Sequence, residues 1–107
     1  MRITFRDYMD WKVIEPIGEV DLYNVSELKK SMFTVTDGTH KYVLVDLSKV
    51  TYMDSSGIGA LVAGNKKMKA HGGEFALVNI QNDVLNILKL ATLDRYFKIY
   101  ETEDDII

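Results

Sequence analysis

Polar and apolar residues alternate at the start of the chain, over residues 2–6. This period of two predicts a half-exposed strand. A short turn at residues 8–10 leads into a second predicted strand at residues 11–17, and the pair forms a hairpin. The only proline, Pro16, lies near the end of the second strand. Because proline cannot donate a ladder hydrogen bond, we expect a sheet edge or a bulge there.

The rest of the chain alternates between helical and extended patterns. Apolar residues spaced by three and four positions predict helices, and short apolar runs without that spacing predict strands. Asp37-Gly38 ends the predicted helix at residues 23–36, and Gly72-Gly73 follows the predicted helix that begins near Ile58. The predicted helices cover residues 23–36, a segment that begins near Ile58, a segment capped by Asn82, and a final turn opened by Thr102; the predicted strands cover residues 42–47, 74–80 and 97–100.

The predicted order is β-β-α-β-α-β-α-β, which is typical of the α/β class. Strands that alternate with helices pair in parallel through right-handed crossovers. We therefore expect a single domain over residues 1–107, with a mostly parallel sheet, one antiparallel strand from the N-terminal hairpin, and about four helices. Functional loops of such sheets gather at the carboxyl ends of the parallel strands. Two loops have that position, at residues 18–23 and 50–57.

Composition narrows the function classes. The chain has 107 residues, no cysteine and a net charge of −3, with a pI near 5.3. Disulfides and cysteine-bound metals are thereby excluded, and an acidic chain without a basic block is a poor nucleic-acid binder. The N-terminus lacks the apolar core of a signal peptide, and the most apolar stretch, residues 57–64, falls short of the roughly 20 residues that span a bilayer. We expect a cytoplasmic protein without a membrane partner.

The segment TYMDSSGIG, residues 51–59, follows a buried strand and opens a helix. Asp54, Ser55 and Ser56 are all good N-cap residues, and the helix start leaves backbone N–H groups free to meet an anion. Gly57 and Gly59 have no side chains that could cover the start of the helix. A purely structural interpretation is equally simple: one serine caps the helix, the other is exposed, and Asp54 complements the helix dipole.

Known catalytic motifs do not fit this segment. It is too short for a P-loop and lacks the phosphate-binding lysine. It does not match the G-x-S-x-G nucleophile elbow either. His40 and His71 lie outside both loops of interest, which argues against a Ser-His-Asp hydrolase. We expect no enzymatic activity, no cofactor and no metal.

The other loop carries Gly18, Glu19, Val20 and Asp21. Asp21 stands just before a helix and could cap it. If the two preceding strands are neighbours, Asp21 lies on the same rim as Asp54. Two carboxylates beside a serine could accept a hydroxyl proton, orient a metal-bound phosphate, or simply be solvated.

Taken together, these motifs resemble the STAS domain, specifically the small bacterial anti-sigma factor antagonists. One departure is the segment Ala91-Thr92-Leu93, where relatives often carry a glycine before the leucine; it concerns only a helix end. The segments that carry the resemblance are GEVD (18–21), VLVDLSKVTYMDSSGIG (43–59), HGGEFALVNI (71–80) and LKLATLDRYFKIYETEDD (88–105).

The resemblance implies a phosphorylation switch at Ser55. In that family the unmodified protein binds an anti-sigma factor that is also a serine kinase, and so frees the sigma factor. Phosphorylation of the first serine of the box ends the binding, and a serine phosphatase resets it. The implied partner-binding residues are Asp21, Asp54, Ser55, Ser56, Gly57, Ile58 and Gly59.

Spacing alone does not choose between the two serines. If Ser56 caps the helix, its hydroxyl is tied to the backbone and Ser55 is the freer nucleophile. Two other functions stay open at this point. The chain could be a STAS regulatory or scaffold subunit of another assembly, or a domain that binds a nucleotide or small ligand at the helix start, residues 55–57.

Overall fold

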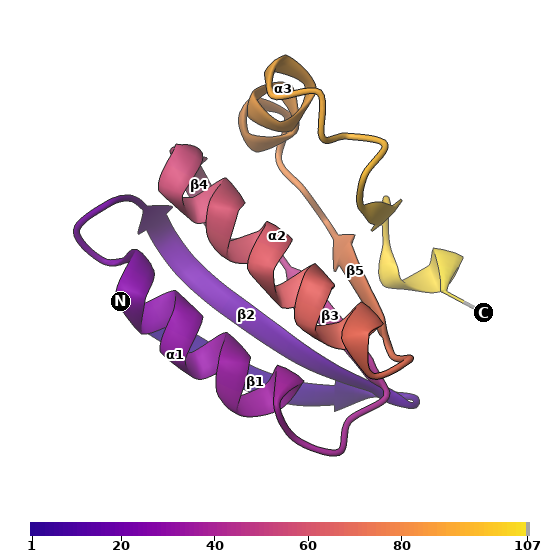
Figure 1. Cartoon of the computed structure of the whole chain (residues 1–107). Helices are drawn as coiled ribbons and strands as arrows, with labels where there is room; N and C mark the ends of the chain where they lie inside the picture. Colours follow the sequence, from indigo (N-terminus) through magenta and orange to yellow (C-terminus); the bar gives the residue numbers. More distant parts are fainter. Residues whose placement is uncertain (107) are drawn as a thin grey trace.

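The computed structural model describes residues 1–106 and shows one mixed sheet with helices on one face (Figure 1). The order of hydrogen-bonded strands is β1-β2-β3-β5-β6, and β4 pairs with β2 off this path. The strands are β1 (Arg2–Tyr8), β2 (Trp11–Val20), β3 (Tyr42–Asp46), β4 (Val50–Met53), β5 (Glu74–Val78) and β6 (Lys98–Tyr100). The helices are α1 (Val25–Thr36), α2 (Ser55–Ala70), α3 (Asn82–Leu90) and the 3₁₀ turn η1 (Glu103–Asp105).

The predicted fold class is confirmed. β1 and β2 form the antiparallel hairpin, and the other strand pairs are parallel. The described residues contain three α-helices, and the fourth predicted helical segment is the 3₁₀ turn with Thr102 at its N-cap. None of the helices within residues 1–106 is long and apolar enough to cross a bilayer.

β4 is the element that the sequence pattern missed. Residues 50–57 were expected to be a loop, but Val50–Met53 form a strand parallel to β2. Val50 and Met53 are buried while the two residues between them are exposed, so this short segment shows neither a clear period of two nor a continuous apolar run. α2 also begins earlier than Ile58, at Ser55, because Asp54 caps it.

Pro16 lies inside β2 and not near its end. β2 pairs with β3 through residues 12–14 and with β4 through residues 18–20. Pro16 therefore falls where β2 changes its parallel partner. The expected bulge is found just beyond, between Gly18 and Glu19, where Gly18 has a φ of +101°. Glycine adopts this backbone conformation without steric cost.

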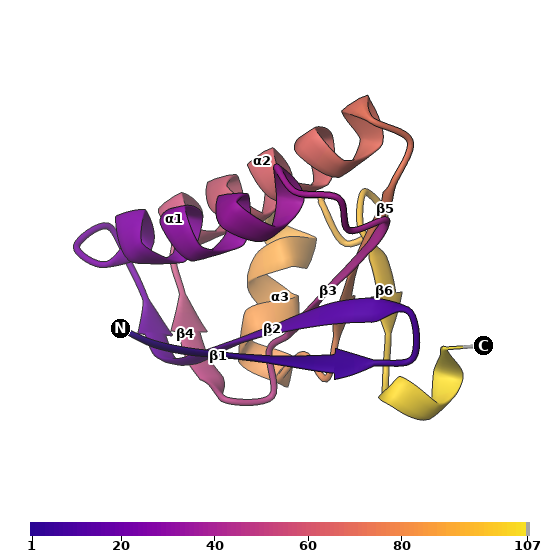
Figure 2. The same cartoon turned by 90° about the horizontal axis from the view of Figure 1, so that it is seen from below.

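Alternate residues of the central strands face two apolar clusters. α1 and α2 lie side by side over one face of the sheet, and η1 lies against the other (Figure 2). On β3, for example, Val43 and Val45 face the helices, whereas Leu44 packs with Trp11 and Ile106 on the opposite face. The near-continuous apolar pattern of β3 follows from this burial on both faces.

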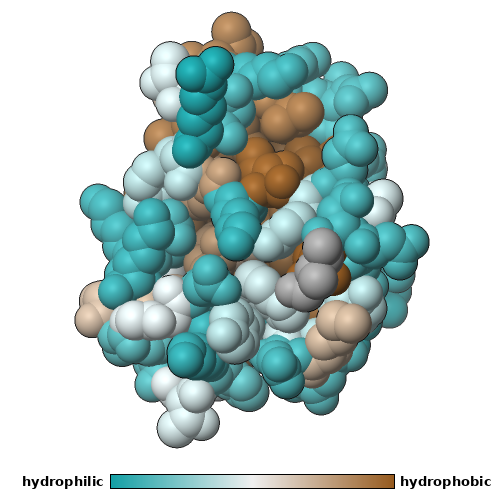
Figure 3. Space-filling view, turned by 90° about the vertical axis from the view of Figure 1, so that its right-hand side faces the viewer, coloured by the Kyte–Doolittle hydropathy of each residue, from teal (hydrophilic) through white to brown (hydrophobic). Residues whose placement is uncertain are grey.

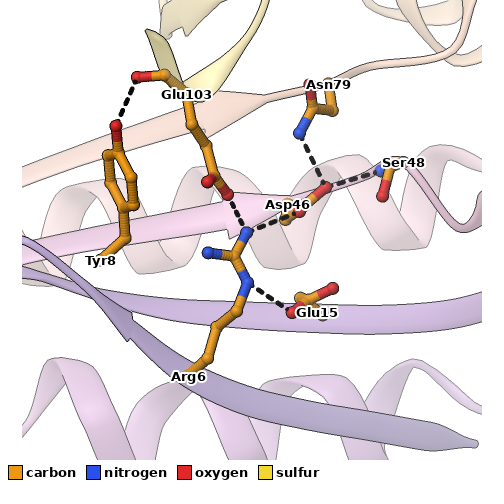
Figure 4. Close-up of polar contacts among 7 residues, drawn as sticks. All are labelled: Arg6, Tyr8, Glu15, Asp46, Ser48, Asn79 and Glu103. Atoms are coloured by element: carbon orange, nitrogen blue, oxygen red, sulfur yellow. Dashed lines mark hydrogen bonds and ion pairs between the residues drawn. The ribbon is translucent and has the colours of Figure 1, made fainter.

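Arg6 joins β1 to the C-terminal turn on this second face (Figure 4). Its guanidinium donates to Glu15 at 2.6 Å, to Asp46 at 2.9 Å, and to Glu103 of η1. Burial alone would lower the pKa of Arg6, but the hydrogen bonds to Glu15 and Asp46 prevail and raise it. The Tyr8 hydroxyl also donates to the backbone carbonyl of Glu103 at 3.2 Å. η1 is therefore fixed to the sheet by polar contacts as well as by Ile106.

The side of the molecule near the C-terminus carries exposed apolar surface. Hydrophobic residues gather in the upper half of this face, toward the end of the molecule where α3 lies (Figure 3). A hollow of about 320 Å³ between α3 and β6 is lined in part by Ile80, Leu85 and Ile99.

Candidate functional site

The carboxyl ends of β2 and β4 lie side by side. Val20 and Met53 are partners in the parallel register, and the backbone N–H of Asp54 donates to the carbonyl of Val20 at 3.1 Å. The loop at residues 21–24 and the start of α2 consequently share one edge of the sheet. The prediction that Asp21 and Asp54 stand on the same rim is confirmed, although the neighbouring strand is β4, which the sequence pattern did not reveal.

Asp54 is the N-cap of α2. Its Oδ1 accepts hydrogen bonds from the backbone N–H groups of Ser56 at 3.0 Å and Gly57 at 3.2 Å, and from the Ser56 hydroxyl. Its Oδ2 accepts from the backbone N–H of Leu22 at 3.0 Å. The hydrogen bond from the Ser56 hydroxyl is the main cause that lowers the pKa of Asp54, against a smaller opposing effect of burial. The carboxylate is therefore ionised at neutral pH and fully engaged.

The two serines differ in exposure and bonding. Ser56 is half-buried, and its hydroxyl donates to Asp54 rather than to the backbone, so among the three candidate caps Asp54, and not a serine, caps the helix. Ser55 is exposed, and no hydrogen bond within residues 1–106 involves its hydroxyl. Ser55 nevertheless carries the freer hydroxyl of the two serines, as expected.

Gly57 and Ile58 face the protein interior. A Cβ at Gly57 would stand 2.5 Å from Cγ of Met53 and 2.9 Å from Cγ1 of Val20, so the glycine allows α2 to approach β2 and β4. Ile58 is 6% exposed and belongs to the core. Both residues are buried, so they offer little surface to a partner. Gly59 is exposed, with nothing within 4 Å of a Cβ built on it.

Asp21 organises the turn before α1. Its Oδ1 accepts from the backbone N–H groups of Tyr23 at 2.9 Å and Asn24 at 3.2 Å. The N-cap position of α1 is Asn24, so Asp21 caps the preceding turn rather than the helix itself. Its side chain is partly exposed on the rim beside α2.

Leu22 and Tyr23 are the surface residues that sequence reasoning missed. Their relative exposures are 71% and 94%, although both side chains are large and apolar or aromatic. Their turn is held at one end by Asp21 and tied to α2 by Asp54, and it turns both side chains outward. The sequence does carry a signal for their exposure. Two large residues in a four-residue connection are rarely both buried, because so short a loop cannot turn both side chains inward.

The carboxylate beside the two serines is engaged within the protein itself. Asp54 accepts four hydrogen bonds, which leaves it poorly placed to take a proton from a substrate. No cluster of three metal-ligating side chains occurs in the part of the chain that the structure describes. What remains is an exposed serine at a helix start beside an exposed apolar pair, a combination typical of a binding surface.

Comparisons with known proteins agree with the resemblance of the motifs. The STAS domain family matches residues 2–106. A candidate anti-sigma factor antagonist of Thermotoga maritima is 37% identical over 95 residues, which cover 87% of this chain and 83% of the relative. The anti-sigma-B factor antagonist of Listeria monocytogenes is 25% identical over 91 residues, covering 83% and 78% of the two chains. Antagonism of an anti-sigma factor is a regulatory binding role and not an enzymatic one.

Solved structures share the whole fold. A crystal structure of a candidate antagonist from Thermotoga maritima has a TM-score of 0.89 at 30% identity, covering 96% of this chain and 89% of that one. The Bacillus cell fate determinant SpoIIAA in its phosphorylated form has a TM-score of 0.73 at 20% identity, covering 98% and 96% of the two chains. With this sequence match and this sheet topology, the chain belongs to the STAS domain family and is related to the anti-sigma factor antagonists.

Proposed function

We propose that this protein is an anti-sigma factor antagonist controlled by phosphorylation of Ser55. The unmodified form binds an anti-sigma factor that is also a serine kinase, and the sigma factor is released. The kinase phosphorylates Ser55, the complex dissociates, and a serine phosphatase restores the binding form in the cytoplasm. The observation that carries the proposal is the exposed Ser55 hydroxyl, free of hydrogen bonds within residues 1–106, at the start of α2.

Accessibility favours Ser55 over Ser56 as the acceptor of phosphate. A kinase must bring the hydroxyl oxygen in line with the γ-phosphoryl group. Ser55 can offer its oxygen without breaking a contact. Ser56 would first have to release Asp54, and the cap of α2 would then lose one of its hydrogen bonds. The phosphorylated SpoIIAA structure shows that a related fold accepts phosphorylation, which supports the proposal.

The physical effect of the phosphate falls on the interface rather than on the fold. A phosphoserine carries about −1.5 to −2 charges at neutral pH. The positive end of the α2 dipole favours an anion there by about 0.3–1 kcal/mol, which offsets part of the repulsion from Asp54. Against a partner carboxylate at about 4 Å, repulsion per charge is on the order of 4 kcal/mol near a surface. Only a fraction of that repulsion energy is needed to weaken partner binding tenfold.

Leu22 and Tyr23 complete the proposed contact surface. An exposed apolar pair next to a modifiable serine provides the buried area that a protein interface needs, while Asp21 and Ser55 provide its polar rim. The bond from Leu22 to Asp54 holds the apolar pair and the serine in a fixed relation. A partner that covers both would be displaced when the phosphate arrives.

A ligand site at the start of α2 is not favoured. The backbone N–H groups of Ser56 and Gly57 already donate to Asp54, so the protein's own carboxylate occupies the place of an anion. A scaffold role in another assembly has no specific observation in its support.

The proposal is tested with the anti-sigma factor recovered from the native cell. Ser55→Ala should bind it like the wild type and stay bound when ATP is added, whereas the wild type is released. Ser55→Asp should fold normally and bind more weakly, although its single charge is smaller than that of a phosphate. ATP-driven release of Ser55→Ala would refute the assignment of Ser55.

A further inference from the structure

β1 forms an open edge of the sheet. Within residues 1–106 it pairs only with β2, and its seven residues follow one unbroken register without a proline or a glycine. β6, at the opposite end of the strand order, has only three residues. Short strands, bulges and prolines protect sheet edges from pairing with another chain. β1 has none of these protections, so its edge can accept a further strand.

The backbone groups of alternate β1 residues point away from β2. In an antiparallel pair of strands, residues that exchange hydrogen bonds alternate with residues that do not. Ile3 pairs with Pro16, which has no N–H, so this pair is of the kind that exchanges none. By alternation, Ile3, Phe5 and Asp7 direct their N–H and C=O groups to the open edge. Outside the pairing with β2, no backbone hydrogen bond within residues 1–106 involves these groups.

The side chains of β1 leave an aromatic ring beside this edge. Ile3 packs against the apolar cluster under α1 and α2, so Phe5, two residues further on, lies on the same face of the sheet. The Phe5 side chain is nevertheless 45% exposed. Arg6 does not guard the edge with its charge, because its guanidinium is turned toward Asp46 and Glu103. The edge therefore combines free backbone groups with uncovered apolar surface.

The sequence of β1 is complementary to itself in one antiparallel register. When two copies of a strand pair about a twofold axis that crosses the sheet, the axis passes through one residue, and opposed residues share a face. An axis at Thr4 would oppose Arg2 to Arg6, and an axis at Arg6 would oppose that residue to itself, so both registers place like charges together. An axis at Phe5 avoids this and lets all seven residues pair, with Phe5 opposite Phe5, Arg2 opposite Tyr8, Ile3 opposite Asp7 and Thr4 opposite Arg6.

We propose that β1 pairs with β1 of a second copy of this chain, antiparallel and with the twofold axis at Phe5, so that two sheets join into one. The outward groups of Ile3, Phe5 and Asp7 in the two copies exchange about six hydrogen bonds, and the two Phe5 rings cover each other. One strand from each copy makes a small interface, so the dimer dissociates readily on dilution. The proposal is independent of the phosphorylation of Ser55, because no residue of the proposed contact surface at the start of α2 belongs to β1.

The test is sedimentation velocity of the full, unmodified chain at concentrations from about 1 μM to about 1 mM. The expected result is a reversible equilibrium of monomer and dimer with a Kd on the order of 100 μM or tighter. Phe5→Lys should raise that Kd at least about tenfold, because it sets like charges opposite each other on the axis. Met9→Lys is the matched control: it places the same charge on an apolar side chain that is 72% exposed in the adjoining turn, and it should leave the Kd unchanged.

Amide hydrogen exchange tests the interface without any substitution. On going from dilute to concentrated protein, the amides of Ile3, Phe5 and Asp7 should become protected, because their N–H groups then donate to the second copy. The amides of Thr4 and Arg6 already face β2 and should change less. Protection of neither set at a concentration where the chain is dimeric would place the contact on another surface and overturn the proposal.

A mixture of two variants tests the register. Phe5→Lys and Phe5→Glu should each be monomeric alone, whereas their equal mixture should dimerise, since opposite charges then face each other across the axis. Phe5→Lys mixed with Met9→Glu should stay monomeric. A wild-type chain that is monomeric up to about 1 mM would refute the proposal and leave the edge of β1 to a strand of another protein. Equal effects of Phe5→Lys and Met9→Lys, or a mixture of the two Phe5 variants that fails to associate, would likewise overturn it.

Discussion

The Oδ2 atom of Asp54 accepts a hydrogen bond from the backbone N–H of Leu22 at 3.0 Å, between residues 32 positions apart in the chain. The same carboxylate caps α2 through its other oxygen. One side chain thus holds the exposed Leu22 and the exposed Ser55 in a fixed relation. This relationship makes a single surface from two loops.

Asp54→Asn tests this role through pH. The pKa of Asp54 is lowered in the folded protein, so its contribution to stability is complete above the ordinary value of 3.8 and is lost as pH falls through the folded value. At neutral pH the variant should melt below the wild type, because the amide nitrogen cannot accept from Leu22 and the negative charge at the start of α2 is lost. Thermal melts at a series of pH values should show the two proteins converging below pH 3.8. Curves that stay parallel down to the lowest pH would contradict the role assigned to the carboxylate.

Gly57→Ala and Gly59→Ala form a matched pair. The methyl group at Gly57 would collide with Met53 and Val20, and overpacking of this kind costs about 1–3 kcal/mol in the free energy of unfolding. The methyl group at Gly59 meets nothing within 4 Å, and alanine is the better helix former by about 0.5–1 kcal/mol. Urea denaturation should therefore show one destabilised and one unchanged or stabilised variant. Equal effects of the two substitutions on stability would show that close packing of α2 does not require a glycine at position 57.

Sequence patterns predicted the fold class well because most elements have strong periodicity. The buried strand at residues 42–47 and the helix with Leu28 and Met32 on its inner face are examples. β4 was missed, since a four-residue strand with two exposed positions carries little pattern and is fixed by pairing with β2. Local pattern cannot report such a tertiary contact.

The candidate site was predicted in position but not in detail. Neighbouring strand ends placed Asp21 and Asp54 together, as the structure confirms. Asp54, rather than a serine, caps α2, because its carboxylate accepts at once from two backbone N–H groups and from a hydroxyl. The attachment of Leu22 to the start of α2 depends on a contact across 32 residues, which a local sequence pattern does not report.

Arg6→Met and Lys12→Met compare a cation that pairs with a buried acid with a cation that pairs with an exposed acid. Asp46 has 5% side-chain exposure, and loss of Arg6 leaves its charge with weaker partners. We expect a loss of roughly 1–3 kcal/mol in the free energy of unfolding. Lys12 pairs at 3.4 Å with Asp7, which is 77% exposed, and its replacement should cost less than about 0.5 kcal/mol. If chemical denaturation gives equal losses in the free energy of unfolding, the ion pairs of Arg6 stabilise the protein no more than the exposed pair of Lys12 does.

Asp21→Asn separates charge from structure in the neighbouring loop. The amide oxygen of asparagine can still accept from Tyr23 and Asn24, so the turn and the melting temperature should change little. Affinity for the anti-sigma factor or the rate of Ser55 phosphorylation should change if the carboxylate faces the partner. Calorimetric melting together with a binding titration checks both. Unchanged binding and phosphorylation would remove Asp21 from the proposed contact surface.

The central claim is that phosphate on Ser55 decides whether the partner binds. The direct measurement is the Kd for the anti-sigma factor of unmodified protein and of homogeneous phosphoprotein, with the modified residue mapped by mass spectrometry. The account predicts phosphate on Ser55, an unchanged fold, and affinity at least about tenfold weaker, because a fraction of a repulsion on the order of 4 kcal/mol per charge suffices. Equal affinities of the two forms, or phosphate found on Ser56, would contradict it.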